Sequence, residues 1–145
     1  MLPKAHFFLT FLLSIILISL GIVSPFQALI ILLAGFLIDV DHWLLYVWEF
    51  RDFNIKNSYR WFYKFYISKE KRKFLCIFHT IEALIVVTLL GLKYPLFLAV
   101  LVGMLFHILL DLIQAYRDGF YSKEISIIYF LLKQAKNKGK LNKLR

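Results

Sequence analysis

The sequence predicts an all-α integral membrane protein: a four-helix bundle of two hairpins, followed by a short helix at the membrane surface. Three observations predict this fold. The chain of 145 residues is 61% hydrophobic and only 19% charged, a composition that one soluble core of this size cannot bury. Four apolar runs approach the ~20 residues that cross a ~30 Å hydrocarbon layer. The basic residues gather between these runs and at the chain ends, where topology can bring them to one side.

The first hairpin is predicted over residues 7–23 and 26–50, because Ser24 and Pro25 form a short turn between two apolar runs. The first run shares the positive flank and apolar core of a secretory signal, but no clear cleavage site follows it. The length of the second run allows a tilt, or a break at its polar cluster. Residues 51–73 are expected to form a basic polar loop whose aromatic residues suit the membrane interface.

The second hairpin is predicted over residues 74–92 and 96–115, with a turn at 91–95. Residues 125–132 are too few to span and are bracketed by lysines, so we expect them to lie along the membrane surface. Residues 133–145 are expected to form a frayed basic tail. The whole chain is thus predicted to be a single membrane domain.

The distribution of charge predicts the orientation. All but Lys93 of the 18 basic residues lie before the first run, in the middle loop, or beyond the fourth run. The positive-inside rule makes that side cytoplasmic, and an even number of spans brings both termini to it. We therefore expect a multi-pass protein of the cell membrane. Its net charge of +9 is expected to meet anionic lipid headgroups, because no nucleic-acid-binding module is recognisable.

Ionisable residues of the apolar runs fall at one depth of the predicted membrane. Such residues are costly there and usually face a bundle interior or a functional cavity. The first and third runs leave the cytoplasm and carry these residues near their start, whereas the second and fourth runs return to it and carry them near their end. Both positions lie in one layer near the cytoplasmic face. The residues of this layer are His6, Asp39, Asp41, His42, His79, Glu82, His107 and Asp111. Cys76, the only cysteine, cannot form an intrachain disulfide and is expected to pack within a helix.

Helical spacing favours convergence within this layer. His79 and Glu82 are three residues apart and His107 and Asp111 are four apart, so each pair is expected to project from one helix face. Asp41 would point elsewhere on an unbroken helix. It is therefore a candidate base, a ligand reached through a local distortion, or a group that supports a ligand from behind.

Four ionised carboxylates in one confined layer are expensive to bury unless something positive compensates them. No Lys or Arg lies in the buried part of any predicted helix. A bound divalent metal is the simplest compensation, and imidazole nitrogen with carboxylate oxygen suits Zn, Mn or Fe. The alternative is that some carboxyl groups stay protonated and hydrogen-bond to His. The predicted metal ligands are His6, Asp39, His42, His79, His107 and Asp111, and the candidate proton acceptors are Asp41 and Glu82.

The motifs that carry these residues are Ile38-Asp39-Val40-Asp41-His42, Phe78-His79-Thr80 and His107-x-x-x-Asp111, preceded by His6. In combination they resemble the YdjM-like family of membrane-bound metal-dependent hydrolases, over most of the chain except the middle loop and the tail. That family is grouped remotely with zinc-dependent phospholipases C and single-strand nucleases, which implies a helical fold, clustered zinc and phosphoester hydrolysis. Two departures are Ile38, where the family often has proline, and the absence of a His-Arg-Gly lead-in, for which Glu82 is a conjectured substitute ligand.

The residues and the resemblance together predict a membrane-bound hydrolase that acts on a phosphoester of a lipid or lipid-linked substrate at the cytoplasmic face. A bound metal lowers the pKa of water toward neutrality. Asp41 or Glu82 is then expected to accept the proton. The alternative is a non-enzymatic membrane protein that binds or conducts a metal ion or a proton, because transport proteins also place His and carboxylates inside helices.

Overall fold

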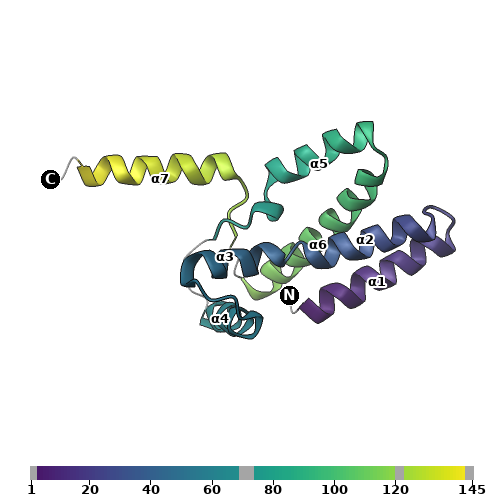
Figure 1. The fold of residues 1–145 in the computed structure, drawn as a ribbon, viewed down its shortest axis with the longest axis horizontal. Helices are drawn as coiled ribbons and strands as arrows, with labels where there is room; N and C mark the ends of the chain where they lie inside the picture. The colour runs from purple at the N-terminus through teal and green to yellow at the C-terminus, as the bar shows by residue number, and fades with distance from the viewer. Residues whose placement is uncertain (1–2, 69–73, 120–122, 143–145) are drawn as a thin grey trace.

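The computed structural model describes residues 3–68, 74–119 and 123–142 (Figure 1). Within these ranges the fold is all-α, as predicted. Its elements are α1 (Pro3–Ser19), α2 (Pro25–Leu37), α3 (Val40–Phe50), α4 (Ile55–Ser68), the 3₁₀ turn η1 (Ile77–His79), α5 (Ile81–Lys93), α6 (Leu96–Asp118) and α7 (Ile127–Asn142). Two stretches of the described chain are long and apolar enough to cross a membrane: Pro25–Phe50, which comprises α2 and α3, and Leu96–Asp118, which is α6.

Helix α2 lies at the centre of the packing, against α1 on one side and α6 on the other, while α5 returns along α6 (Figure 1). Two glycines allow α2 and α6 to approach closely. A Cβ atom on Gly103 would lie 2.5 Å from the carbonyl oxygen of Ile31 and 2.9 Å from the backbone nitrogen of Gly35. Both obstacles are backbone atoms, so no side-chain rotation relieves the overlap. The absence of a side chain at Gly103 therefore sets the distance between the two helices.

The second apolar run breaks at Ile38 and Asp39, so of the tilt and the break that its length allows, the structure shows the break. Beyond Leu37 the backbone tightens: the amide of Asp41 donates to the Ile38 carbonyl at 3.5 Å, and that of His42 donates to the Asp39 carbonyl at 3.1 Å. These are bonds to the third residue back instead of the fourth, the pattern of a 3₁₀ turn. The turn changes the direction of the side chains, so that Asp39 and Asp41, two positions apart, both reach His79.

The expectation of a loop over residues 51–73 is wrong for most of its length, because α4 occupies Ile55–Ser68. The side chain of Asn54 accepts hydrogen bonds from the first amides of this helix, and Asp52 accepts from the Asn54 amide. Asx side chains that cap backbone amides in this way are a common start for a helix. Residues 69–73 of the predicted loop lie outside the described residues.

An aromatic face of α4 packs beneath α3 and the chain before η1. Phe65 is buried against Phe74 and Cys76, and Trp61 and Phe62 cover the same cluster. The rings of Phe65 and Phe74 meet edge to face with centroids 4.5 Å apart, a favourable arrangement for aromatic pairs. The aromatic residues that suggested the membrane interface thus form a small core between α4 and the body of the protein.

The third apolar run, predicted as one helix over 74–92, is helical only from α5 onward, apart from the single turn η1. Thr80 has extended backbone angles and caps α5, its hydroxyl accepting from the amide of Ala83. Because this cap lies between His79 and Glu82, the two residues do not share a helix face. The expectation that they form an i, i+3 pair is therefore wrong.

Residues 123–126, which we name the strap, pair with the irregular part of the third run. The amide of Glu124 donates to the Phe74 carbonyl at 2.8 Å, and the amide of Ile81 donates to the Ile125 carbonyl at 2.9 Å. These bonds satisfy backbone groups that a helix would otherwise satisfy internally. The strap therefore stabilises the irregular chain before α5.

Helix α7 begins directly after the strap and runs to Asn142, well beyond the short segment expected at 125–132. The tail expected to fray from residue 133 is helical as far as that point, and the last three residues lie outside the description. Glu82 holds the start of this helix: its carboxylate accepts from the hydroxyl of Ser126 and from the amides of Ile127 and Ile128. A carboxylate at a helix amino end also complements the helix dipole.

Replacing Glu82 with alanine is expected to loosen the start of α7, because three donors lose their acceptor. The loss of a helix cap costs about 1 kcal/mol, which corresponds to roughly fivefold faster amide exchange. Hydrogen exchange at Ile127 and Ile128 measures the effect, and metal content is expected to stay unchanged. Glu82→Gln keeps one oxygen acceptor and is expected to show a smaller effect. Unaltered exchange in Glu82→Ala would contradict the capping role.

Candidate metal centre

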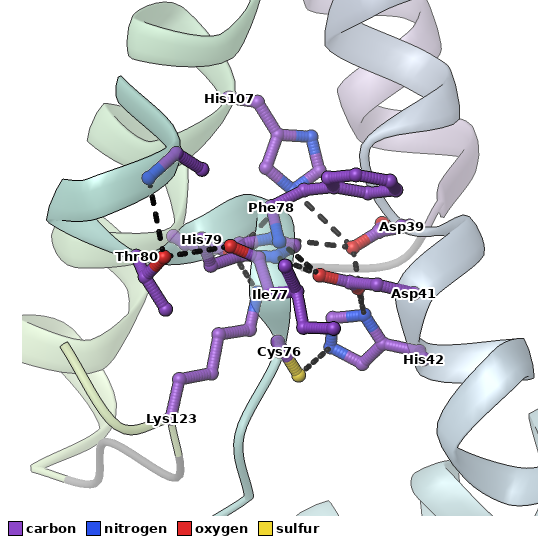
Figure 2. Close-up of polar contacts among 12 residues, drawn as sticks. Asp39, Asp41, His42, Cys76, Ile77, Phe78, His79, Thr80, His107 and Lys123 are labelled. Carbon is purple, nitrogen blue, oxygen red and sulfur yellow. Dashed lines mark hydrogen bonds and ion pairs between the residues drawn. The ribbon is translucent and has the colours of Figure 1, made fainter. Parts of the chain in front are cut away.

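Five side chains from four separate parts of the chain converge where α2 breaks (Figure 2 shows part of the cluster). Helix α1 contributes His6, the break contributes Asp39, η1 contributes His79, and α6 contributes His107 and Asp111. The three histidines are buried. The residues that the sequence predicts to share one layer thus also lie close to one another.

The atoms of this cluster form two groups of three, each spaced like donors around an ion: His6, His107 and Asp111, and Asp39, His79 and His107. The Nε2 atom of His107 lies 3.3 Å from Asp39 Oδ1 and 3.5 Å from Asp111 Oδ2. The corresponding distances from His79 Nε2 are 3.6 and 3.7 Å, and His6 Nε2 lies 3.2 Å from Asp111 Oδ1. Two donors about 2.0–2.1 Å from a tetrahedral zinc ion lie roughly 3.3–3.4 Å apart. The side chains therefore fit a divalent cation with little rearrangement.

Hydrogen bonds behind the rings indicate how they are protonated. The Nδ1–H of His107 donates to the Gly35 carbonyl at 2.7 Å, and the Nδ1–H of His79 donates to Asp41 Oδ2 at 3.0 Å. With Nδ1 protonated, a neutral imidazole carries its lone pair on Nε2. Neither Nε2 atom makes a hydrogen bond with the described residues. Lone pairs of nitrogen and carboxylate oxygen thus face one another, an arrangement that a cation between them stabilises.

Asp41 supports the cluster from behind. Its Oδ1 accepts from His42 Nδ1 at 2.8 Å, and its Oδ2 accepts from the Phe78 amide and from His79, each at 3.0 Å. Both oxygens are thereby turned away from the Nε2 side of His79. Of the three roles open to Asp41 from the sequence, this geometry favours the group that orients a ligand.

His42 lies at the edge of the cluster, beside a thiol that sequence reasoning did not include. Its Nδ1 is 3.4 Å from Asp39 Oδ1, and its Nε2 is 3.8 Å from the sulfur of Cys76. Asp41, His42, Cys76 and His79 form a second group with donor atoms close enough for a metal. Cys76 does pack against aromatic rings, but in an extended segment and not within a helix. Its position three residues before His79 is the signal that could have identified it.

Lys123 reaches the cluster from the strap and forms an ion pair with Asp111. Burial alone would lower the pKa of Lys123, but the charges of Asp111 and Asp39 raise it above its usual value. From the sequence, this lysine is expected to lie outside the membrane, and a metal alone is expected to supply the positive charge at the site. The structure corrects that expectation, because one buried ammonium group already offsets part of the negative charge.

Glu82 does not belong to the cluster, because its carboxylate faces the start of α7. The predicted site residues that the structure brings together are His6, Asp39, Asp41, His42, His79, His107 and Asp111. Their donor set, imidazole nitrogens with carboxylate oxygens, suits a divalent transition metal.

Replacing Asp41 with asparagine is expected to weaken metal binding about 10- to 100-fold, because His79 loses the charged acceptor that fixes its ring. Titration of metal into the purified, metal-stripped protein measures this change. Asp52→Asn is the matched control: Asp52 accepts from Tyr46 and Asn57 at the surface, away from the cluster. Equal affinity in both variants would contradict an orienting role for Asp41.

No family model matches the sequence, no curated protein matches it, and no solved structure matches the fold. The resemblance to the YdjM-like family therefore stays a prediction from the motifs. What the chain does has to be inferred from its own geometry.

Proposed function

We propose that the protein is a four-span membrane protein in which α1, α2 with α3, α5 and α6 cross the bilayer. Apolar side chains on the outward faces of all these helices support this proposal, among them Phe8, Leu33, Leu89 and Leu109. Large contiguous apolar surfaces are rare on soluble monomers, and a lipid environment accounts for them. Helix α5 has 13 residues and is short for a span, so the bilayer has to thin or α5 has to draw on the residues before it.

Both termini and the basic segments lie on the cytoplasmic side in this proposal, following the positive-inside rule. Helix α4 then rests beside the cytoplasmic surface, and the basic part of α7 contacts anionic headgroups. The cluster of His and Asp residues comes to the depth of the inner headgroups. Membership in the YdjM-like family remains part of the same proposal.

The site binds one or more divalent metals through His6, Asp39, His79, His107 and Asp111. The converging Nε2 and carboxylate atoms, 3.2 to 3.7 Å apart, are the observation on which this depends. Zinc fits the donor set best, and manganese or iron also suits it. Asp41 is a positioning residue for His79, with His42 beside it.

The activity is hydrolysis of a phosphoester in a lipid or lipid-linked substrate. A bound divalent metal supplies a Lewis acid and an activated water at neutral pH. Asp39 has a side chain 24% exposed, against 10% for Asp111, and so marks the side from which water and substrate approach. Lys123 adds a positive charge beside Asp111, which favours the developing charge on phosphoryl oxygens.

The test uses the full chain purified in detergent. We expect at least one zinc per chain by elemental analysis, together with turnover of a phospholipid in a phosphodiester panel. A chelator is expected to abolish turnover, and added zinc is expected to restore it. Absence of stoichiometric metal would overturn the metal site. Metal without turnover of any phosphoester, combined with ion flux in proteoliposomes, would favour the non-enzymatic alternative.

A further inference from the structure

A groove of about 510 Å³ opens between α2, α5 and α6, and its walls are almost entirely apolar. Its lining includes Leu37, Ile38, Phe78, Val86, Val100 and Met104. Glu82 is the one charged residue among the described residues that line it, and the carboxylate of Glu82 is bound to the start of α7. The volume lies within the range of about 300–1,000 Å³ typical of small-molecule sites.

One end of the groove lies beside the metal centre. Ile38 directly precedes Asp39, and Phe78 directly precedes His79, while the Phe78 amide donates to Asp41. From there the lining runs along each helix away from the strap and the basic segments. On α2 it continues backward to Ala34, on α6 backward to Val100, and on α5 forward to Val87. The groove therefore leads from the polar cluster into the apolar half of the bundle.

We propose that this groove holds one acyl chain of a glycerophospholipid whose phosphate lies at the metal centre. The inference rests on the proposed function, and two neighbouring features identify the class of substrate. The apolar walls match a hydrocarbon chain, and Lys123 with the bound cation matches an anionic headgroup. Because one end of the groove lies beside the cluster, one molecule can reach both.

Charge favours a lipid over an apolar helix of a second copy as the occupant. Lys123 lies at the cluster with its ammonium group paired to Asp111. An anionic headgroup complements this ammonium group and a bound cation, whereas an apolar helix offers no matching charge.

The groove acts on position as well as on affinity. A lipid chain that leaves the bilayer for the groove exchanges one apolar surrounding for another, so its retention depends on close packing against the groove walls and not on burial alone. Holding the chain in the groove fixes the ester beside the cluster, and such orientation accelerates a reaction. Filling the groove is therefore expected to lower the turnover of long-chain lipids and to leave the turnover of small, water-soluble phosphodiesters unchanged.

The experiment compares Val86→Trp with Ile85→Trp in the full chain. Val86 lines the groove, whereas its neighbour Ile85, similarly exposed, does not. Native mass spectrometry after addition of dioleoyl phosphatidylglycerol is expected to show one retained lipid in wild type and in Ile85→Trp. Val86→Trp is expected to retain at least tenfold less. Zinc content is expected to be equal in all three proteins, which confirms that the cluster has folded.

A chain-length series on wild type gives a second measurement that needs no variant. Dioleoyl phosphatidylglycerol is expected to be retained and the dihexanoyl lipid lost. Equal retention of lipid by the three proteins, equal retention of both chain lengths, or a cross-linked second copy in the groove would each overturn the inference. Selective retention without turnover of any phosphoester would reject the proposed hydrolysis and leave the lipid groove standing. If Val86→Trp loses turnover of long-chain lipids but keeps turnover of small phosphodiesters, both the proposed hydrolysis and the lipid groove are supported.

Discussion

Replacing His107 with alanine is expected to strip the protein of metal and to lower phosphoester turnover by about 1,000-fold. Its Nε2 faces both Asp39 and Asp111, its Nδ1 is bound to the Gly35 carbonyl, and its ring stacks on that of His6 at 3.9 Å. The substitution thus removes one ligand, and it also removes the ring against which a second ligand, His6, is packed. Metal catalysis supplies several kcal/mol, and each 1.36 kcal/mol corresponds to a factor of ten.

Elemental analysis and turnover of a lipid phosphodiester measure the two effects in the same preparation. Ser14→Ala is the control, because Ser14 is also a buried polar residue, bonded to the Ala28 carbonyl away from the cluster. Added imidazole is expected to restore part of the metal binding in His107→Ala. Full metal content and full activity in His107→Ala would reject the proposed site.

Replacing Gly103 with alanine is expected to destabilise the fold by about 3 kcal/mol, the upper part of the range for overpacking. The new methyl group would overlap backbone atoms of α2, so the two helices have to separate. Separation also lengthens the bond from His107 to the Gly35 carbonyl, and metal affinity is expected to fall with stability. Thermal unfolding in detergent and metal titration provide the two measurements.

Gly91→Ala is the matched control for this prediction. A Cβ atom on Gly91 would meet the end of the Leu98 side chain at 2.7 Å, and that side chain can rotate away. Both glycines are helical, so both substitutions gain the same helix propensity of about 1 kcal/mol. Gly91→Ala is therefore expected to be close to neutral. Similar stability of the two variants would show that contact between α2 and α6 does not limit the packing.

The sequence was sufficient to predict the helical class and the convergence of the His and Asp residues. Both depend on periodic, local information: the length of apolar runs, and the offset of His and Asp along them. The length of the second run left a tilt and a break near Asp39 both open, and the structure shows the break. His107 and Asp111 lie on one unbroken helix and could be paired from their spacing alone.

Elements that depend on distant partners could not be predicted. Helix α4 looked like a loop because its Tyr, Asn and Lys residues are weak or polar helix signals, and its stability comes from packing of Phe65 on Phe74. The extended segment before α5 looked helical because its residues are apolar, and the strap, more than forty residues later, stabilises its irregular shape. The spacing of His79 and Glu82 predicts that both face the site. The cap at Thr80 interrupts the helix between them, so Glu82 points elsewhere.

The strap makes the charge of the cluster depend on a segment that can separate from it. Lys123 is paired with Asp111, so wherever the strap leaves the body of the protein, the cluster carries one more uncompensated negative charge and attracts divalent cations more strongly. Docking of the strap and binding of a cation at Asp111 are therefore expected to oppose each other.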